Sequence, residues 1–148
     1  MFSARLVATR PVERPSYAWL ALFLQLATAL TAVPVGLSLM LDPSGAGIQL
    51  PSEWIQKSAF GSYFIPGMYL FGMNGLGMIA VAALIWLRHW AAPWLTGILG
   101  AGLVIWILVQ LVVMPEVMWL QWAFLVVGLL LGFIALFWLR RTSQLRLW

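Results

Sequence analysis

The sequence predicts an all-α membrane protein, built as a bundle of four transmembrane helices, and three observations support this fold class. Of the 148 residues, 64% are hydrophobic and 8% are charged, whereas soluble domains are about half apolar and a quarter charged. The apolar residues form four runs, each long enough to cross a bilayer as a helix. Seven of the eight basic residues are arginines, and these fall into alternate segments between the runs.

The chain begins with a basic arm, residues 1–16, in which Pro11 and Pro15 interrupt any helix. The first span follows at residues 17–40 and would be about 36 Å long as a helix, enough to cross the hydrocarbon with some tilt. A secretory signal peptide is the competing interpretation, because a basic segment precedes the apolar run. The run is too long for the hydrophobic part of a signal peptide, so we favour a membrane span.

The connector of residues 41–61 starts with the turn signature DPSG at Asp42. Further along, Ser52 is expected to cap a short turn of helix. Trp54 and Ile55 would lay this turn on the membrane surface. The sequence therefore predicts a short amphipathic segment in the first external loop.

Prolines mark the ends of the later spans. Pro66 is tolerated in the first turn of the second span, where a proline removes no helical hydrogen bond. Pro93 opens the third span, and Pro115 stops it. The expected spans are residues 17–40, 62–87, 93–114 and 118–139, which form one transmembrane domain over residues 17–139, followed by a tail of residues 140–148.

The arginines predict how the chain is oriented in the membrane. They lie in the N-terminal arm, in the tail and, as Arg88, in the link between the second and third spans. The other two links carry Lys57 with the acidic residues Asp42, Glu53 and Glu116. The positive-inside rule then places both termini in the cytoplasm. We expect a multi-pass protein of the bacterial cytoplasmic (inner) membrane.

Each span carries one narrow face of small residues, which is how transmembrane helices approach closely when lipid supplies no hydrophobic drive. We expect most of these stripes to be contacts within one chain, with a contact between copies as the alternative. A GxxxG pair occurs in the fourth span. The glycines predicted to mediate helix packing are Gly36, Gly72, Gly75, Gly97, Gly100, Gly128 and Gly132.

Four intramembrane amides, Gln25, Asn74, Gln110 and Gln121, occur one per span. An unpaired amide is costly in hydrocarbon, so each is expected to find a partner. Hydrogen bonds between helices, worth about 1 kcal/mol each, are the favoured interpretation, and a polar binding cavity is the alternative. Topology brings Gln110 and Gln121 to the same depth, so we expect each to bond to the other or to nearby backbone.

No catalytic, cofactor-binding or metal-binding constellation is found in the sequence. The chain has no cysteine, which excludes thiol catalysis and iron–sulfur ligation. The single histidine, His89, is expected at the membrane surface, with an axial contact to a pigment or haem of a larger complex as the alternative. Asp42, Glu53 and Glu116 are expected in turns and helix ends, although three carboxylates on one side would also suit a cation. We expect no enzyme and no cofactor.

Several short segments resemble a known group of proteins. The DPSGAG turn, the AFGSYFIPG segment that leads into a glycine-rich second span, and VIWILVQ in the third resemble a group of small four-span bacterial membrane proteins of uncharacterised function. The resemblance covers most of the chain after Tyr17. It implies the fold and carries no activity.

Composition and the absence of charge within the spans restrict the function. No Asp, Glu, Lys or Arg lies in a predicted span, which argues against a proton-coupled transporter. The few dispersed basic residues argue against nucleic-acid binding. We expect a non-enzymatic protein that acts as an accessory or scaffolding subunit, or that binds an apolar ligand. A small oligomeric transporter or channel is the alternative. The expected partners are the lipid bilayer and other membrane subunits or further copies of the chain.

Overall fold

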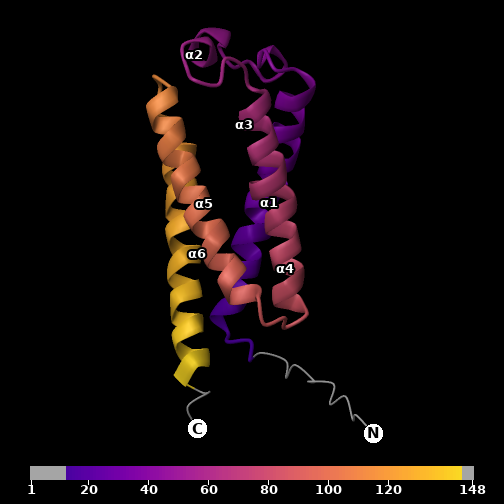
Figure 1. The fold of residues 1–148 in the computed structure, drawn as a ribbon, viewed down its shortest axis with the longest axis vertical. Coiled ribbons are helices and arrows are strands. Elements are labelled where there is room, and N and C mark those ends of the chain that lie inside the picture. Colours follow the sequence, from indigo (N-terminus) through magenta and orange to yellow (C-terminus); the bar gives the residue numbers. More distant parts are fainter. Residues whose placement is uncertain (1–12, 145–148) are drawn as a thin grey trace, which may run out of the picture.

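The structure is a computed structural model that describes residues 13–144, and every regular element in this part of the chain is a helix. The predicted all-α fold with four helices of membrane-spanning length is confirmed (Figure 1). These helices have the length and hydropathy of a multi-pass membrane protein. They are α1 (Tyr17–Leu41), the continuous helix Phe64–Trp86, α5 (Ala92–Val113) and α6 (Trp119–Gln144).

The second span is continuous but not uniform. It consists of α3 (Phe64–Tyr69), the π-helical segment η2 (Leu70–Gly77) and α4 (Met78–Trp86). Pro66 lies in its first turn, as predicted. A π-helix closes its hydrogen bonds over five residues instead of four, so η2 is wider than an α-helix and changes which side chains face each neighbour.

The connector after α1 is held by the carboxylate of Asp42. Its Oδ1 accepts hydrogen bonds from the hydroxyl and N–H of Ser44 at 2.6 and 3.2 Å, and its Oδ2 accepts one from the Gly47 N–H at 2.9 Å. These donors, the Ser44 hydroxyl first and then the Gly47 N–H, hold the pKa of this carboxyl below its ordinary value. Two short helices follow, η1 (Ala46–Ile48) and α2 (Ser52–Gln56).

Two expectations for the connector are wrong. Ser52 is the first residue of α2 and makes no side-chain cap, because Pro51 occupies the capping position. Ile55 does not lie on the membrane surface. It is 3% exposed and packs with Leu39 and Tyr63, so the apolar side of α2 faces the bundle and closes its end.

The fourth helix is longer than the predicted span of residues 118–139, because α6 continues through Arg140 and Arg141 to Gln144. The Thr142 hydroxyl donates to the carbonyls of Trp138 and Leu139, and the Ser143 hydroxyl donates to that of Arg140. The last turn of α6 therefore contains polar side chains bonded back to their own helix, beyond the end of the apolar run.

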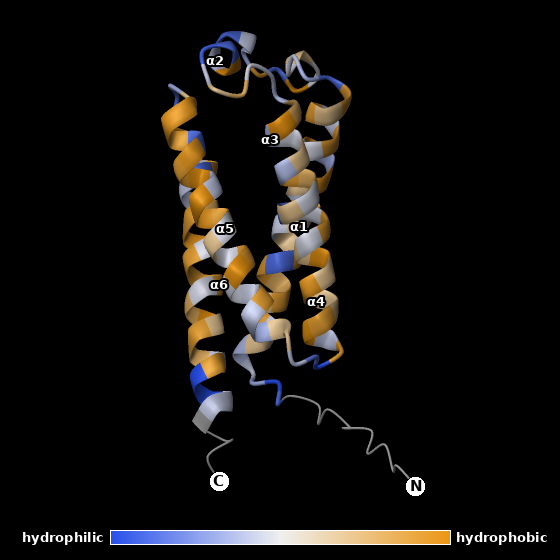
Figure 2. Ribbon diagram, viewed as in Figure 1, coloured by the Kyte–Doolittle hydropathy of each residue, from blue (hydrophilic) through white to orange (hydrophobic). Residues whose placement is uncertain are grey.

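The four long helices form two antiparallel hairpins. One consists of α1 with α3, η2 and α4, and the other of α5 with α6. The first described residues and the end of α6 lie at one end of the molecule, which we call the terminal end, and α2 lies at the opposite end, the α2 end (Figure 1). The Trp138 Nε1 donates to the Glu13 carbonyl at 3.2 Å. Polar residues concentrate at these two ends, with apolar helix between them (Figure 2).

Glycines set the closest approach within each hairpin. A Cβ added at Gly100 would lie 2.9 Å from both the Gly128 carbonyl oxygen and the Gly132 nitrogen, so α5 and α6 meet backbone to backbone. A Cβ at Gly36 would lie 2.5 Å from the Phe71 nitrogen and 2.9 Å from the Gly67 oxygen. Gly67 was not among the predicted packing glycines, although it makes this second crossing possible.

The other predicted packing glycines differ from one another. A Cβ at Gly75 would lie 2.8 Å from the Val33 side chain, and one at Gly97 would lie 3.1 Å from the Ala135 Cβ. A Cβ at Gly72 or Gly132 would meet nothing within 4 Å. A side chain therefore has room at these two positions, although the Gly132 nitrogen itself lies at the α5–α6 crossing. Gly72 lies in η2, where spacing of 100° per residue no longer gives the face.

Candidate functional site

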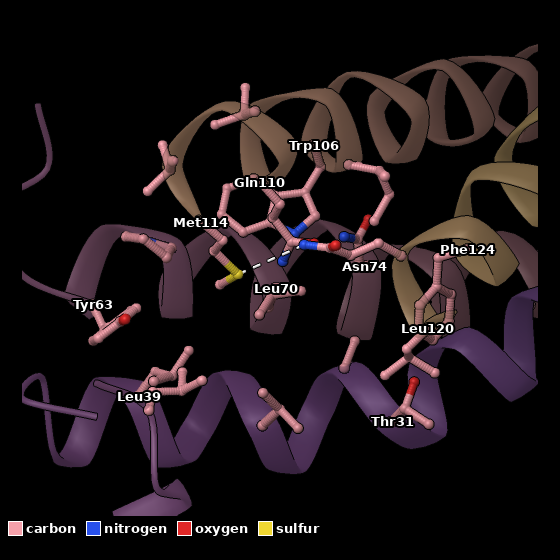
Figure 3. Close-up of a pocket in the computed structure, with 18 of the residues that line it drawn as sticks. Thr31, Leu39, Tyr63, Leu70, Asn74, Trp106, Gln110, Met114, Leu120 and Phe124 are labelled. Atoms are coloured by element: carbon pink, nitrogen blue, oxygen red, sulfur yellow. Dashed lines mark hydrogen bonds between the residues drawn. The ribbon is translucent and has the colours of Figure 1, made fainter. Parts of the chain in front are cut away.

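A cavity of about 220 Å³ lies between the two hairpins and extends toward the α2 end. Val35 and Leu39 of α1 form one wall, and Leu103 and Ile107 of α5 contribute to the opposite one. The connector closes the α2 end with apolar side chains that include Ile55. Figure 3 shows Leu39 and Thr31 on one side of this space, with Trp106 and Gln110 across from them.

The cavity lies where the hairpins diverge: they pack closely near the terminal end, and farther along Tyr69 reaches across to α5. Ala18, Ala21 and Ala92 are fully buried there, and such small side chains let helices approach. Gln25 and Thr96 link the hairpins at the edge of this contact: the Gln25 Nε2 donates to the Thr96 Oγ1 at 3.1 Å, and both residues are fully buried. Toward the α2 end the facing side chains are larger, and the hairpins diverge (Figure 1).

Two buried hydrogen-bond donors line the cavity without a partner. The Asn74 Nδ2 and the Trp106 Nε1 make no hydrogen bond, although Asn74 is 2% exposed and Trp106 is 8% exposed. Both residues line the cavity, and they lie in the same part of it (Figure 3). Leaving a buried donor unpaired costs about 1–3 kcal/mol, so this pair marks a place where two donors are buried without a hydrogen-bond partner.

The position of the Trp106 indole is fixed by its neighbours. Its ring stacks on that of Tyr69, with centroids 4.7 Å apart and planes 19° from parallel. The Tyr69 hydroxyl donates to the Gly102 carbonyl at 2.9 Å. The indole is therefore held against a ring that is itself anchored to α5. Nothing in the sequence indicates this role for Trp106.

Asn74 belongs to η2, and the π-helical geometry brings it to the cavity. By the rise of an α-helix, it lies roughly 15 Å along the span from Phe64, close to the middle of the bundle. Asn74 and Gly75 are the buried residues of η2. π-helical turns within α-helices are frequent at functional sites, and this one contains an amide whose Nδ2 is buried and unpaired.

The other predicted amides have different environments. The Gln121 Oε1 accepts from the Met118 N–H at 3.0 Å, and its Nε2 contacts the Met114 sulfur at 3.7 Å. Gln121 thus bonds to nearby backbone, as expected, and not to Gln110. The Gln25 Oε1 has no partner, so that amide is satisfied on one side.

The residues weighed as ligands or acids have structural environments. His89 is exposed, and its Nδ1 accepts from the Ala91 N–H at 3.2 Å. Asp42 organises the connector. Over residues 13–144, no group of three or more His, Cys, Asp and Glu side chains is arranged to hold a metal ion. The cavity is therefore the feature of the described chain from which a function can be argued.

Comparison of the chain with protein-family models, with curated proteins and with solved structures gave no match. The resemblance to small four-span bacterial proteins stays a prediction. Function has to be argued from the fold and from the cavity.

Proposed function

We propose that this chain is a non-enzymatic protein of the bacterial inner membrane that binds an apolar ligand between its two hairpins. The observation that carries the proposal is the partly open, apolar cavity of about 220 Å³. An apolar cavity of roughly 150 Å³ is enough to admit benzene. An empty cavity forfeits the dispersion contacts of its walls, so a fitting apolar molecule gains them on entry.

The chemistry of the walls favours binding over catalysis. Among the described residues that line the cavity, none is a carboxylate, an imidazole, an amine or a guanidinium, and these are the groups that transfer protons in most active sites. Closure of the terminal end by buried alanines and by the Gln25–Thr96 bond favours binding over conduction. A scaffolding role would not require a cavity.

Binding is tested with an undecane derivative that carries a photoreactive diazirine, added to the protein in nanodiscs. We expect labelling of the cavity walls that saturates and is competed by unlabelled undecane. Ala32→Phe fills the cavity from α1, where Ala32 is 5% exposed, and should reduce this labelling several-fold. Leu30→Phe, at a position 79% exposed, is the matched control and should label like the parent. Labelling that never saturates and follows exposure alone would refute the proposal.

The proposed orientation has both termini in the cytoplasm and the α2 end outside. It is supported by the distribution of arginines. Because the parent chain has no cysteine, Ala46→Cys and Ser143→Cys each create one labelling site, and both positions are exposed. In intact spheroplasts, an impermeant maleimide should label the first variant and spare the second until the cells are lysed. The reverse pattern would invert the orientation, and labelling of both would contradict a four-span topology.

A further inference from the structure

We propose that the ligand carries a neutral hydrogen-bond acceptor, a carbonyl oxygen, which is received by the Asn74 Nδ2 and the Trp106 Nε1. This inference rests on the proposed function, because it specifies the chemistry of a molecule held in the same cavity. Its basis is the pair of buried donors without partners in one part of a largely apolar cavity, which is also lined by the amides of Gln110 and Gln121.

The polarity of the missing partner follows from the donors. An indole nitrogen only donates hydrogen bonds, and so does the nitrogen of an amide. A ligand atom that pairs with both must therefore accept. In hydrocarbon no water competes for such donors. An acceptor on the ligand therefore removes the free-energy cost of leaving both donors unpaired.

The acceptor should also be uncharged. A carboxylate or phosphate placed among these walls would be a buried ion, and no described lining residue is a cation that would pair with it. A carbonyl oxygen has two lone pairs and accepts two hydrogen bonds without bringing charge. An ester, a ketone or a quinone attached to an apolar body meets both requirements.

The fixed position of the Trp106 indole indicates a specific binding site and not a non-specific apolar surface. Because the Tyr69 ring stacks on Trp106 at 4.7 Å and is itself bonded to the Gly102 carbonyl, the Nε1–H keeps its direction without a ligand. A preorganised donor loses little freedom when it binds, so more of its interaction appears as affinity.

The test compares two competitors that differ at one carbon, undecane and methyl nonyl ketone, each displacing the diazirine probe at equal mole fraction in the nanodisc. We expect the ketone to be about tenfold more effective, which corresponds to about 1.4 kcal/mol. Asn74→Leu and Trp106→Phe should each reduce the ratio of ketone potency to undecane potency several-fold, with undecane measured in the same variant as the reference.

The outcomes separate the two proposals. If undecane itself does not compete, the cavity binds no apolar ligand and the proposed function fails. If undecane competes but the ketone is no better, or if its advantage survives in both variants, the donors do not recognise a carbonyl and this inference alone is overturned. Melting of each variant in the same nanodiscs shows whether it is folded. Because the two substitutions lie on different helices, one variant still tests the proposal if the other does not fold.

Nanodiscs of ester-linked and ether-linked phosphatidylcholine distinguish the source of the carbonyl. Ether lipids lack the ester carbonyl. If a lipid ester normally occupies the site, the ketone should displace the probe more effectively in ether-linked discs, where that competitor is absent. If the natural ligand is a free apolar molecule, the ketone should perform equally in both.

Discussion

Gly100→Ala is expected to destabilise the protein by about 1–3 kcal/mol, the usual effect of adding a methyl group to a closely packed contact. The new Cβ would lie 2.9 Å from the Gly128 oxygen, the Gly132 nitrogen and the Leu131 Cβ. Two of these three atoms belong to the backbone, which cannot rotate away as a side chain does. The α5–α6 hairpin must therefore separate along its length. Thermal melting of the purified protein in a mild detergent measures the loss.

The control for this substitution comes from the facing helix. Gly132→Ala adds the same methyl group on α6, where its Cβ meets nothing within 4 Å. Because alanine favours the helix over glycine by about 1 kcal/mol, this variant should melt at or above the temperature of the parent. Equal melting of the two variants would mean that the crossing at Gly100 is looser than described.

The number of spans could be predicted from the sequence because it depends on local quantities. Each span is determined by features within one helix: its length, its hydropathy and the prolines Pro66, Pro93 and Pro115. These features do not depend on contacts with another helix. Helix ends were less accurate. The helix α6 continues to Gln144, whereas the apolar pattern from which its end was predicted stops before Arg140.

The cavity could not be predicted, because it results from how two hairpins meet. Its walls come from four helices and a connector. The sequence of one segment does not show how far that segment lies from the next. Asn74 was identified by its polarity, whereas Trp106 resembled any other apolar residue in a span. What distinguishes Trp106 is that its buried Nε1 has no hydrogen-bond partner, and this depends on the whole fold.

The glycine stripes show where a periodic pattern fails. A Cβ added at Gly36 or Gly100 would collide with the facing backbone, whereas one added at Gly72 or Gly132 would meet nothing within 4 Å. One cause is η2, whose wider turn shifts the face after Leu70. The other is that both glycines of the GxxxG pair lie at the crossing with Gly100, but the Cβ direction at Gly132 points away from the facing helix.

Gly36→Ala is expected to have an effect as large as that of Gly100→Ala and to act on the cavity as well. The added Cβ would lie 2.5 Å from the Phe71 nitrogen and 2.9 Å from its Cα, which is too close for any side-chain movement to relieve. The first helix must move away from α3 and η2. We expect a loss of about 1–3 kcal/mol in stability, measured by melting.

The same movement displaces a wall of the cavity. Val35 and Leu39 line the cavity on either side of Gly36 along α1, and Leu70 lines it from η2. A wider crossing alters their spacing, so binding of the diazirine probe should weaken together with stability. Gly100→Ala acts at the crossing of α5 with α6, so it should weaken binding of the probe less than Gly36→Ala does. Gly72→Ala, with nothing within 4 Å of its Cβ, is the matched control and should leave both measurements as in the parent. A Gly36→Ala protein that melts normally and binds the probe like the parent would show that this crossing neither supports the hairpin nor shapes the site.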